Sequence, residues 1–420
     1  MHYLADFREK WRPLVGASLG LGSGVALQSF IMGVFAPYLL SALGWSKADF
    51  AMLGVLSILV LFAVPVVGRL ADVYGVRKVA AVGVVAVPLN LVAMSLLTGP
   101  LYQYAIVLIV QMTLCATTSA AVYTRLIVQN FDRSRGGALA LAVSMPAVVG
   151  AIGSPLAVAF IGAHGWRAGF LAVAAFAAVT GFIGLLCIPP TLPRATAPET
   201  RETAAVGKAS KDYGLILRNP TFWILFAAAF LVSLPQVLTN SQLAIVLTEN
   251  GASPALAGSI VSIFAIGVII GRVLAGIALD RFPAEMVAAV GLSLPGFGMF
   301  LLASPFDQPL VLASAILLVG LAFGAEGDVI AYLVVKHFGI RIYSTVIGLT
   351  FAAIGGAATF GAVALSESIR MTGGYGAFLV IGGTGVLLGS LLFLVLGRRR
   401  PLQPVVEPDD QPLQAIPATA

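Results

Sequence analysis

The sequence predicts an all-α membrane protein with twelve transmembrane helices, arranged as two pseudo-symmetric six-helix bundles. Three observations support this fold class: the composition, the spacing of the charges and an internal repeat. Hydrophobic residues make up 59% of the chain and charged residues 10%, whereas an ordinary globular domain holds about 45–50% and about 25%. A soluble fold cannot bury that much apolar surface, so we expect a lipid bilayer to surround the helices.

The spacing of the charges sets the number of spans. A transmembrane helix needs about 20 mostly apolar residues, and the charged residues leave uncharged runs of roughly that length. The predicted spans are 15–43, 50–70, 79–99, 102–129, 136–163, 168–189, 221–248, 255–279, 285–304, 309–335, 343–366 and 375–397. The first run is longer than the apolar segment of a signal peptide and lacks a clear cleavage site, so we interpret it as a span.

The distribution of basic residues predicts the orientation. Lys47, Arg167 and Arg370 fall in loops on the side opposite the N-terminus, and Arg272 lies within a span. The other twenty of the 24 Lys and Arg residues share the side of the N-terminus. Because cytoplasmic loops carry an excess of basic residues, we expect both termini in the cytoplasm and a multi-pass protein of a prokaryotic inner membrane. The net charge of +6 lies in these loops and indicates no nucleic-acid partner.

Landmark residues recur 207 or 208 positions apart, which indicates that the two halves are duplicates. Gly68 matches Gly276, Asp72 matches Asp280, Gln28 matches Gln236, Phe131 matches Phe338, and Gly165 matches Gly373. A polar, proline-rich segment separates six spans from six. We therefore expect one bundle at 1–189, a cytoplasmic connector at 190–220, a second bundle at 221–397 and a disordered cytoplasmic tail at 398–420.

The loop after the second span carries a recognisable motif. Its distinctive residues are Gly68, Asp72, Gly75, Arg77 and Lys78, and the second half repeats part of it as Gly276, Asp280 and Arg281. This motif resembles the signature between helices 2 and 3 of the major facilitator superfamily. A generic basic loop would explain the two cations but not the aspartate, the glycines and the repeated copy together.

The resemblance covers almost the whole chain and implies a transporter whose halves rock around a central cavity. It also implies gating roles for the motif residues of both halves. Arg125 lies about one turn from the end of the fourth span, near the loop that carries Asp72, so a gating or anchoring role is favoured over substrate binding.

A second set of residues resembles one branch of that superfamily. Arg135–Leu139 open the fifth span, Pro155 lies within it, and Gly165–Arg167 follow it, as in monocarboxylate and oxalate–formate carriers. The glycine-rich motif of drug-exporting antiporters is only partly present, at Gly150–Leu156. Export is therefore disfavoured, though it stays an alternative.

Three ionisable residues lie deep within predicted spans: Arg272, Glu326 and Asp328. Each costs about 2.5–3.5 kcal/mol on insertion scales, so each is a functional hypothesis by default. Arg272 precedes Asp280 by eight residues and Asp328 precedes Lys336 by eight, so both lie roughly 12 Å from the same membrane face. A contact between Arg272 and one acid is geometrically plausible.

Arg272 is the first candidate for substrate binding. Its guanidinium stays charged and presents a planar fork to a carboxylate. Arg272 and Gly276 resemble an arginine and glycine of the eighth helix in monocarboxylate carriers, which implies anion binding. Those carriers often have an aspartate where this chain has Val268, and residues 343–366 lack the lysine of oxalate carriers, so a monoanion is favoured. The alternative is a purely structural pair between Arg272 and an acid.

Glu326 and Asp328 flank Gly327, on a helix where Gly320, Gly324, Gly327 and Ala331 form a seam of small residues. Residues two apart lie about 200° apart around a helix, so only one acid can easily reach Arg272. A substrate carboxylate at Arg272 would weaken the hold of that cation on the acid and favour its protonation. We therefore hypothesise that one acid carries a proton in symport; alternatively it only neutralises Arg272.

Gln28 on the first span, and Gln236 and Asn240 on the seventh, could line the cavity, because these helices border it in the family. The alternative is that these side chains only hydrogen-bond neighbouring helices.

Other classes find little support. Cys115 and Cys187 form no metal or disulfide pattern, and no nucleophile and base set suggests an enzyme, so we expect no cofactor and no metal. The tail is too short and polar for a signalling domain, which disfavours a sensor. We expect a monomeric, proton-coupled symporter of a small, monocarboxylate-like organic anion; the alternative is a proton-driven antiporter that exports a drug or metabolite.

Overall fold

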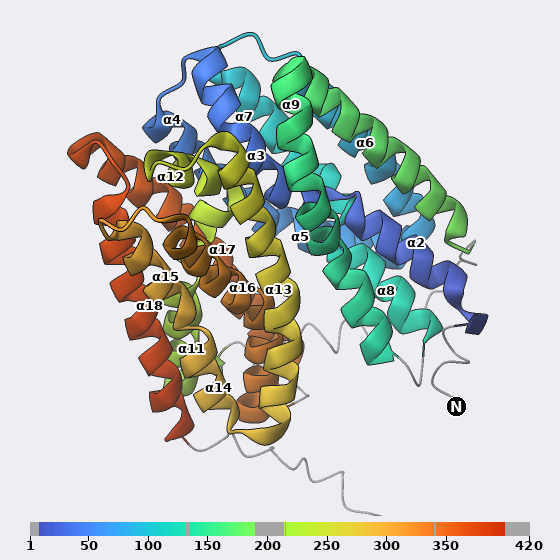
Figure 1. Cartoon of the computed structure of the whole chain (residues 1–420). Helices are drawn as coiled ribbons and strands as arrows, with labels where there is room; N and C mark the ends of the chain where they lie inside the picture. Colours follow the sequence, from blue (N-terminus) through green and yellow to red (C-terminus); the bar gives the residue numbers. More distant parts are fainter. Residues whose placement is uncertain (1–7, 132–134, 190–213, 215, 340–341, 400–420) are drawn as a thin grey trace, which may run out of the picture.

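The structure, a computed structural model, describes residues 8–131, 135–189, 214, 216–339 and 342–399. The side chains of Asp72, Arg135 and Ser344 lie outside the described part, as do nearly all of the expected connector and tail. The described residues form helices and turns without a strand. Figure 1 shows two bundles of helices, coloured blue to green and yellow to red.

The first bundle holds six spans. Its helices are α2 (Trp11–Gly22), α3 (Val25–Leu43), α4 (Lys47–Met52), η1 (Leu53–Ile58), α5 (Leu59–Tyr74), α6 (Val76–Ser95), α7 (Leu101–Thr113), η2 (Cys115–Thr118), α8 (Ala120–Asn130) and α9 (Arg135–Cys187). Two spans are broken: α2 and α3 meet at Ser23, and α7 bends by 43° into η2 and α8. Gly165 divides α9 into two spans with φ 82°, a conformation that glycine adopts without steric cost.

The second bundle repeats the plan. Its helices are α11 (Pro220–Val232), η3 (Leu238–Gln242), α12 (Leu243–Glu249), α13 (Pro254–Arg281), α14 (Ala284–Gly291), α15 (Leu294–Ala303), α16 (Pro309–Phe338), α17 (Tyr343–Thr372) and α18 (Gly376–Gly397). Its first span is interrupted between Ser233 and Gln242, where η3 is a π-helix. Single π-turns of this kind are frequent at functional sites.

The described part contains nine helices long and apolar enough to cross a membrane, or ten with the bent pair of α7 and α8. One of these, Gly136–Cys187, is two spans because it turns back at Gly165. The broken segment from α11 to α12 supplies the remaining span. Each of the twelve predicted spans is helical to within a few residues, so the predicted fold class is confirmed.

Glycines bring α13 and α16 into close contact. A Cβ on Gly271 would lie 1.9 Å from Leu321 O, and a Cβ on Gly324 would lie 2.0 Å from Val268 O. The predicted seam therefore exists at Gly320 and Gly324, but the prediction was wrong for Gly327, which has no atom within 4 Å of its Cβ position. The reason is that Gly327 lies on an exposed face of α16.

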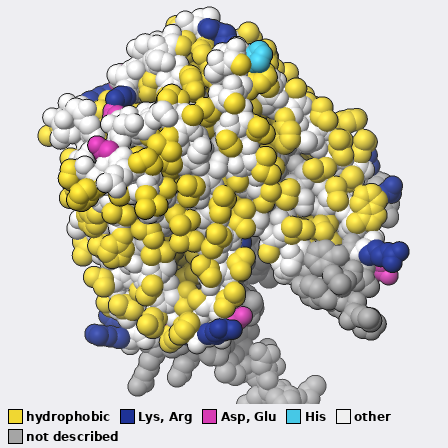
Figure 2. Space-filling view, viewed as in Figure 1, with side chains coloured by type: hydrophobic (Ala, Val, Ile, Leu, Met, Phe, Trp, Pro, Cys, Tyr) yellow, Lys and Arg dark blue, Asp and Glu magenta, His cyan; other side chains and the backbone are white. Residues whose placement is uncertain are grey.

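The two ends of the molecule differ. The basic end carries Arg69, Arg77, Lys78, Arg281 and Lys336, and the opposite end carries the turns that follow α3, α12 and α17. At the opposite end one apolar core joins both halves, because Phe30 and Val34 share it with Leu243 and Phe264. At the basic end each half has its own core. Figure 1 shows the bundles diverging toward the side of the N-terminus, and Figure 2 shows the surface hollowed between them there.

Ion pairs hold the halves together at the opposite end. Arg370 at the end of α17 bonds Asp49 of α4, with Nη2 2.9 Å from Oδ1, and Lys47 pairs with Glu249 of α12. Arg370 also bonds Glu367 on its own helix at 3.1 Å. The molecule is therefore closed at the opposite end and open at the basic end.

Candidate functional site

Arg272 and Asp328 form an ion pair on facing helices. Arg272 projects from α13 and Asp328 from α16, with Nε 3.3 Å from Oδ2. The side chain of Arg272 is 24% exposed and that of Asp328 is 54% exposed. The contact lacks hydrogen-bond alignment at Nε, and among the described residues no hydrogen bond reaches the terminal amino groups of Arg272. The guanidinium is thus neutralised but keeps donors for another anion.

The pair lies where the halves part. Ala265, seven residues before Arg272 and so on the same face of α13, is fully buried in the core shared by both halves. Phe30 of the first half contacts Phe264, and Phe264 contacts Phe323, with ring centroids 5.8 and 5.5 Å apart. Phe264 and Phe323 precede Arg272 and Asp328 on their helices, so this contact between the halves lies toward the opposite end from the ion pair.

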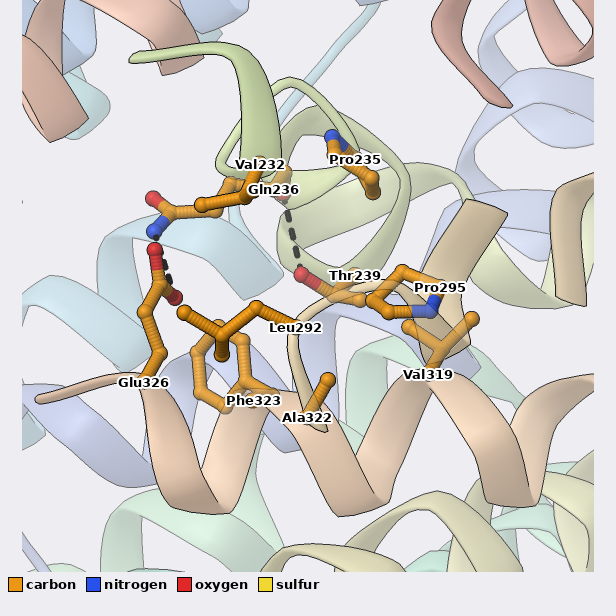
Figure 3. A pocket seen from close by; sticks show the side chains of 10 residues that line it. All are labelled: Val232, Pro235, Gln236, Thr239, Leu292, Pro295, Val319, Ala322, Phe323 and Glu326. Atoms are coloured by element: carbon orange, nitrogen blue, oxygen red, sulfur yellow. Dashed lines mark hydrogen bonds between the residues drawn. The ribbon is translucent and has the colours of Figure 1, made fainter. Parts of the chain in front are cut away.

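Glu326 faces a different neighbour. Its carboxylate is bonded by Ser233, which follows α11, and Gln236 Nε2 lies 3.5 Å from its Oε2. Figure 3 shows Glu326 reaching from α16 toward Gln236, beside apolar side chains that include Phe323 and Leu292. They surround a cavity of about 20 Å³, enough for about one water molecule. Among the described residues no cation pairs with Glu326.

The hydrogen bonds of Ser233 bear on the protonation of Glu326. Ser233 Oγ lies 2.7 Å from Ala229 O and also contacts Glu326 Oε1. A hydroxyl has one proton to donate, so it cannot serve both oxygens as a donor. The arrangement is satisfied in full when Ser233 donates to the carbonyl and Glu326 itself carries a proton.

The other residues proposed for substrate binding differ in environment. Gln236 is half-buried at Glu326, and Asn240 is half-buried in η3 without a hydrogen bond among the described residues. Gln28 is only 2% exposed, and neither of its amide atoms has a partner in the described part. Gln236 therefore lies with Glu326, while Gln28 lies in the core shared by both halves.

The motif residues lie at the basic end. Gly75 forms the turn between α5 and α6 with φ 86°, whereas Gly68 lies within α5 and has no atom within 4 Å of its Cβ position. Gly68 therefore makes no close helix contact in this conformation. Arg77 is half-buried and Lys78 is exposed, and the side chain of Asp72 lies outside the described part.

The remaining gating candidates also lie near this end. Arg125 is half-buried on α8, and Asp280 and Arg281 are exposed at the end of α13. None of them contacts Arg272 or Glu326, so the structure separates the motif residues from the deep charges.

Sequence reasoning missed Ser233 and the three phenylalanines. Ser233 lies three residues before Gln236, and Pro235 between them predicts a break in the span, which was the available signal. The contact of Phe30 with Phe264 depends on the packing of the two halves, and no local pattern reports it.

Two helical bundles that meet at one end and part at the other, with a half-buried cation and two acids deep in the second bundle, define a membrane transporter. The sequence matches the family described as Major Facilitator Superfamily over residues 18–362 and again over residues 225–418. The chain belongs to the Major Facilitator Superfamily. This is a family of transporters, not of enzymes. Comparison with curated proteins gives no match.

Solved structures show the same fold. The D-xylose–proton symporter is similar with a TM-score of 0.71 at 16% identity, covering 93% of this chain and 97% of that one. A variant of the nucleoside transporter NupG gives 0.72 at 17%, covering 92% and 99%. A variant of the peptide transporter POT gives 0.67 at 17%, covering 93% and 94%. At these identities the likeness shows the fold, and the substrates differ among the three.

Proposed function

We propose that this protein is a secondary active transporter that moves a small, monocarboxylate-like organic anion in symport with protons by alternating access. The observation that supports the anion is Arg272, whose Nε faces Asp328 while its terminal amino groups have no hydrogen-bond partner in the described part. A guanidinium of this kind can bind a carboxylate with two parallel hydrogen bonds. Gln236 and Asn240 supply further polar contacts.

The two acids have separate roles in this proposal. Asp328 neutralises Arg272, and Glu326 carries the proton, because Glu326 can change its protonation without first breaking an ion pair. Binding of one anion and one proton adds no net charge to the site. The transporter therefore changes conformation with the same net charge at the site whether the site is loaded or empty.

The ends of the molecule act as alternating gates. The basic end, with Asp72, Asp280 and Arg281, faces the cytoplasm of a prokaryotic cell, and it closes when the pairs of Asp49 and Lys47 at the opposite end break. The protein acts as a monomer, because each chain carries both halves of the site.

A thermal-shift panel tests the anion. The purified protein is heated with small mono- and dicarboxylates, sugars and cationic drugs, using the wild type, Arg272→Gln and, as the control, Arg281→Gln. We expect monocarboxylates to stabilise the wild type and Arg281→Gln but not Arg272→Gln. Stabilisation by cationic drugs alone, or by carboxylates in all three proteins, contradicts the proposal and favours the exporter.

A further inference from the structure

Each half carries an apolar groove among equivalent helices. The first-half groove, of about 590 Å³, lies between α5, α6 and the bend of α7, and the second-half groove, of about 330 Å³, lies between α13, α14 and α16. All residues lining the second-half groove except Gly291 and Leu294 stand 208 positions after a residue lining the first. Val66 and Leu274 are one such pair. The two grooves are therefore copies related by the internal repeat.

The first-half groove opens to the bilayer. Phe62 and Val66 at its mouth are 68% and 57% exposed. Lys78 begins a stripe on α6 that continues through Val82 and Leu89, both exposed and apolar, at the spacing of one helix face. Exposed apolar side chains along a membrane span contact lipid, so the mouth of this groove faces acyl chains.

The copies differ at their basic end. The first-half groove ends at Tyr74 and Lys78, where the second-half groove has Phe282 and Met286. Lys78 is exposed, and no described acid pairs with it; Tyr74 is 59% exposed with no described hydrogen-bond partner. Only the first-half groove therefore combines an apolar channel with a cation and a hydroxyl at the level of the headgroups.

We propose that the first-half groove binds a glycerophospholipid with an anionic headgroup. One acyl chain lies along Val66 and Leu70, and the phosphate accepts hydrogen bonds from Lys78 and Tyr74. The occupant is a lipid rather than a soluble phosphate because the groove leads from this cation into the apolar span. A basic residue at the surface of a membrane favours anionic lipid, and Met286 gives the second-half groove no such preference.

Native mass spectrometry of the full chain in detergent tests the headgroup. Phosphatidylglycerol and phosphatidylcholine with identical acyl chains are titrated against the wild type and Lys78→Met, which copies the second-half groove. We expect the wild type to bind phosphatidylglycerol more tightly than phosphatidylcholine. Lys78→Met should weaken phosphatidylglycerol binding by about fivefold and leave phosphatidylcholine unchanged. Equal binding of both lipids to the wild type, or phosphatidylglycerol bound equally by both proteins, overturns the proposal.

Substitutions at equivalent positions of the two grooves test where the lipid binds. Val66→Trp fills the first-half groove and should abolish the preference for phosphatidylglycerol, whereas Leu274→Trp fills the second-half groove and should not. Met286→Lys should create a second phosphatidylglycerol site. These variants test whether the first-half groove binds the anionic lipid even if Lys78→Met does not fold. The proposal fails if Val66→Trp and Leu274→Trp have the same effect.

Discussion

Arg272, Glu326 and Asp328 share one level of the second half, but their surroundings assign them different chemistry. Asp328 lies against a cation, and Glu326 lies against a hydroxyl and an amide. The sequence predicted their common depth, because eight residues of helix separate Arg272 and Asp328 from charges at the basic end. It could not predict which acid faces Arg272, because that depends on the rotation of α16 against α13.

Neutralising each acid separately should separate coupling from binding. Glu326→Gln should lose accumulation driven by a proton gradient but keep exchange of substrate across the membrane, because the amide can still bond Ser233 but cannot release a proton. Asp328→Asn should instead lower the melting temperature, because it leaves Arg272 without its counter-ion. Proton-driven uptake and counterflow in proteoliposomes measure the first effect. Full proton-driven uptake by Glu326→Gln would assign the proton to another group.

We expect Gln28 to destabilise the substrate-free protein. Its amide is buried without a partner in the described part, and such a group costs about 1–3 kcal/mol. We expect Gln28→Met to raise the melting temperature of the empty protein and to reduce transport. Thermal unfolding with and without substrate measures this; a lower melting temperature would show that Gln28 is satisfied in the protein.

At the scale of elements, hydropathy predicted all twelve spans because lipid contact constrains some 20 residues at once. The interruptions within the spans were not predicted, and two of them are informative. No proline or glycine lies at the bend after Thr113. The π-helix at Leu238–Gln242 contains only residues that are compatible with a regular helix. Packing between elements determines the first break, whereas Pro235, just before the π-helix, is a local signal for the second that hydropathy does not register.

The contact between α13 and α16 can be tested with two matched glycines. Gly324→Ala places a methyl group against the backbone of Val268, where the Cβ would lie 2.0 Å from a carbonyl oxygen. This should destabilise the protein by about 1–3 kcal/mol. Gly327→Ala, one turn away in open space, should be neutral or slightly stabilising, because alanine favours helices. Thermal unfolding of both variants measures the difference, and equal melting temperatures would contradict the close packing.

At the scale of the whole molecule, the repeat predicted equivalent halves, and the two grooves show the equivalence in three dimensions. The sequence did not predict the conformation. One core joins the halves at the opposite end and separate cores fill them at the basic end. Apolar residues of similar composition line all three cores, so hydropathy cannot tell which surfaces meet in a given state.

The pair of Arg370 with Asp49 should bias this conformation. Asp49→Asn removes a bond between the halves, whereas Glu367→Gln removes one within α17. Exposed pairs contribute about 0.2–1 kcal/mol, so Asp49→Asn should raise the population open at the opposite end by up to about fivefold. Distances between spin labels at Ser41 and Met371, measured by double electron–electron resonance spectroscopy, report this shift. An equal shift in Glu367→Gln would show that the bond between the halves has no special role.

Gly68 should matter only when the basic end closes. It faces open space in this conformation, so Gly68→Leu should leave the melting temperature unchanged and abolish transport by preventing close approach of the halves. Gly136, also in open space at this end, is the matched position for a control, Gly136→Leu. Unimpaired transport by Gly68→Leu would show that α5 is not part of a closing gate.

The central claim is that a proton gradient drives a small carboxylate across the membrane through Arg272 and Glu326. The most direct measurement is uptake of a labelled monocarboxylate, chosen from the thermal-shift panel, into proteoliposomes with an inward proton gradient. We predict accumulation above equilibrium by the wild type, equilibration without accumulation by Glu326→Gln, and no uptake by Arg272→Gln. Expulsion of the carboxylate by the same gradient, or accumulation by Arg272→Gln, would contradict the account.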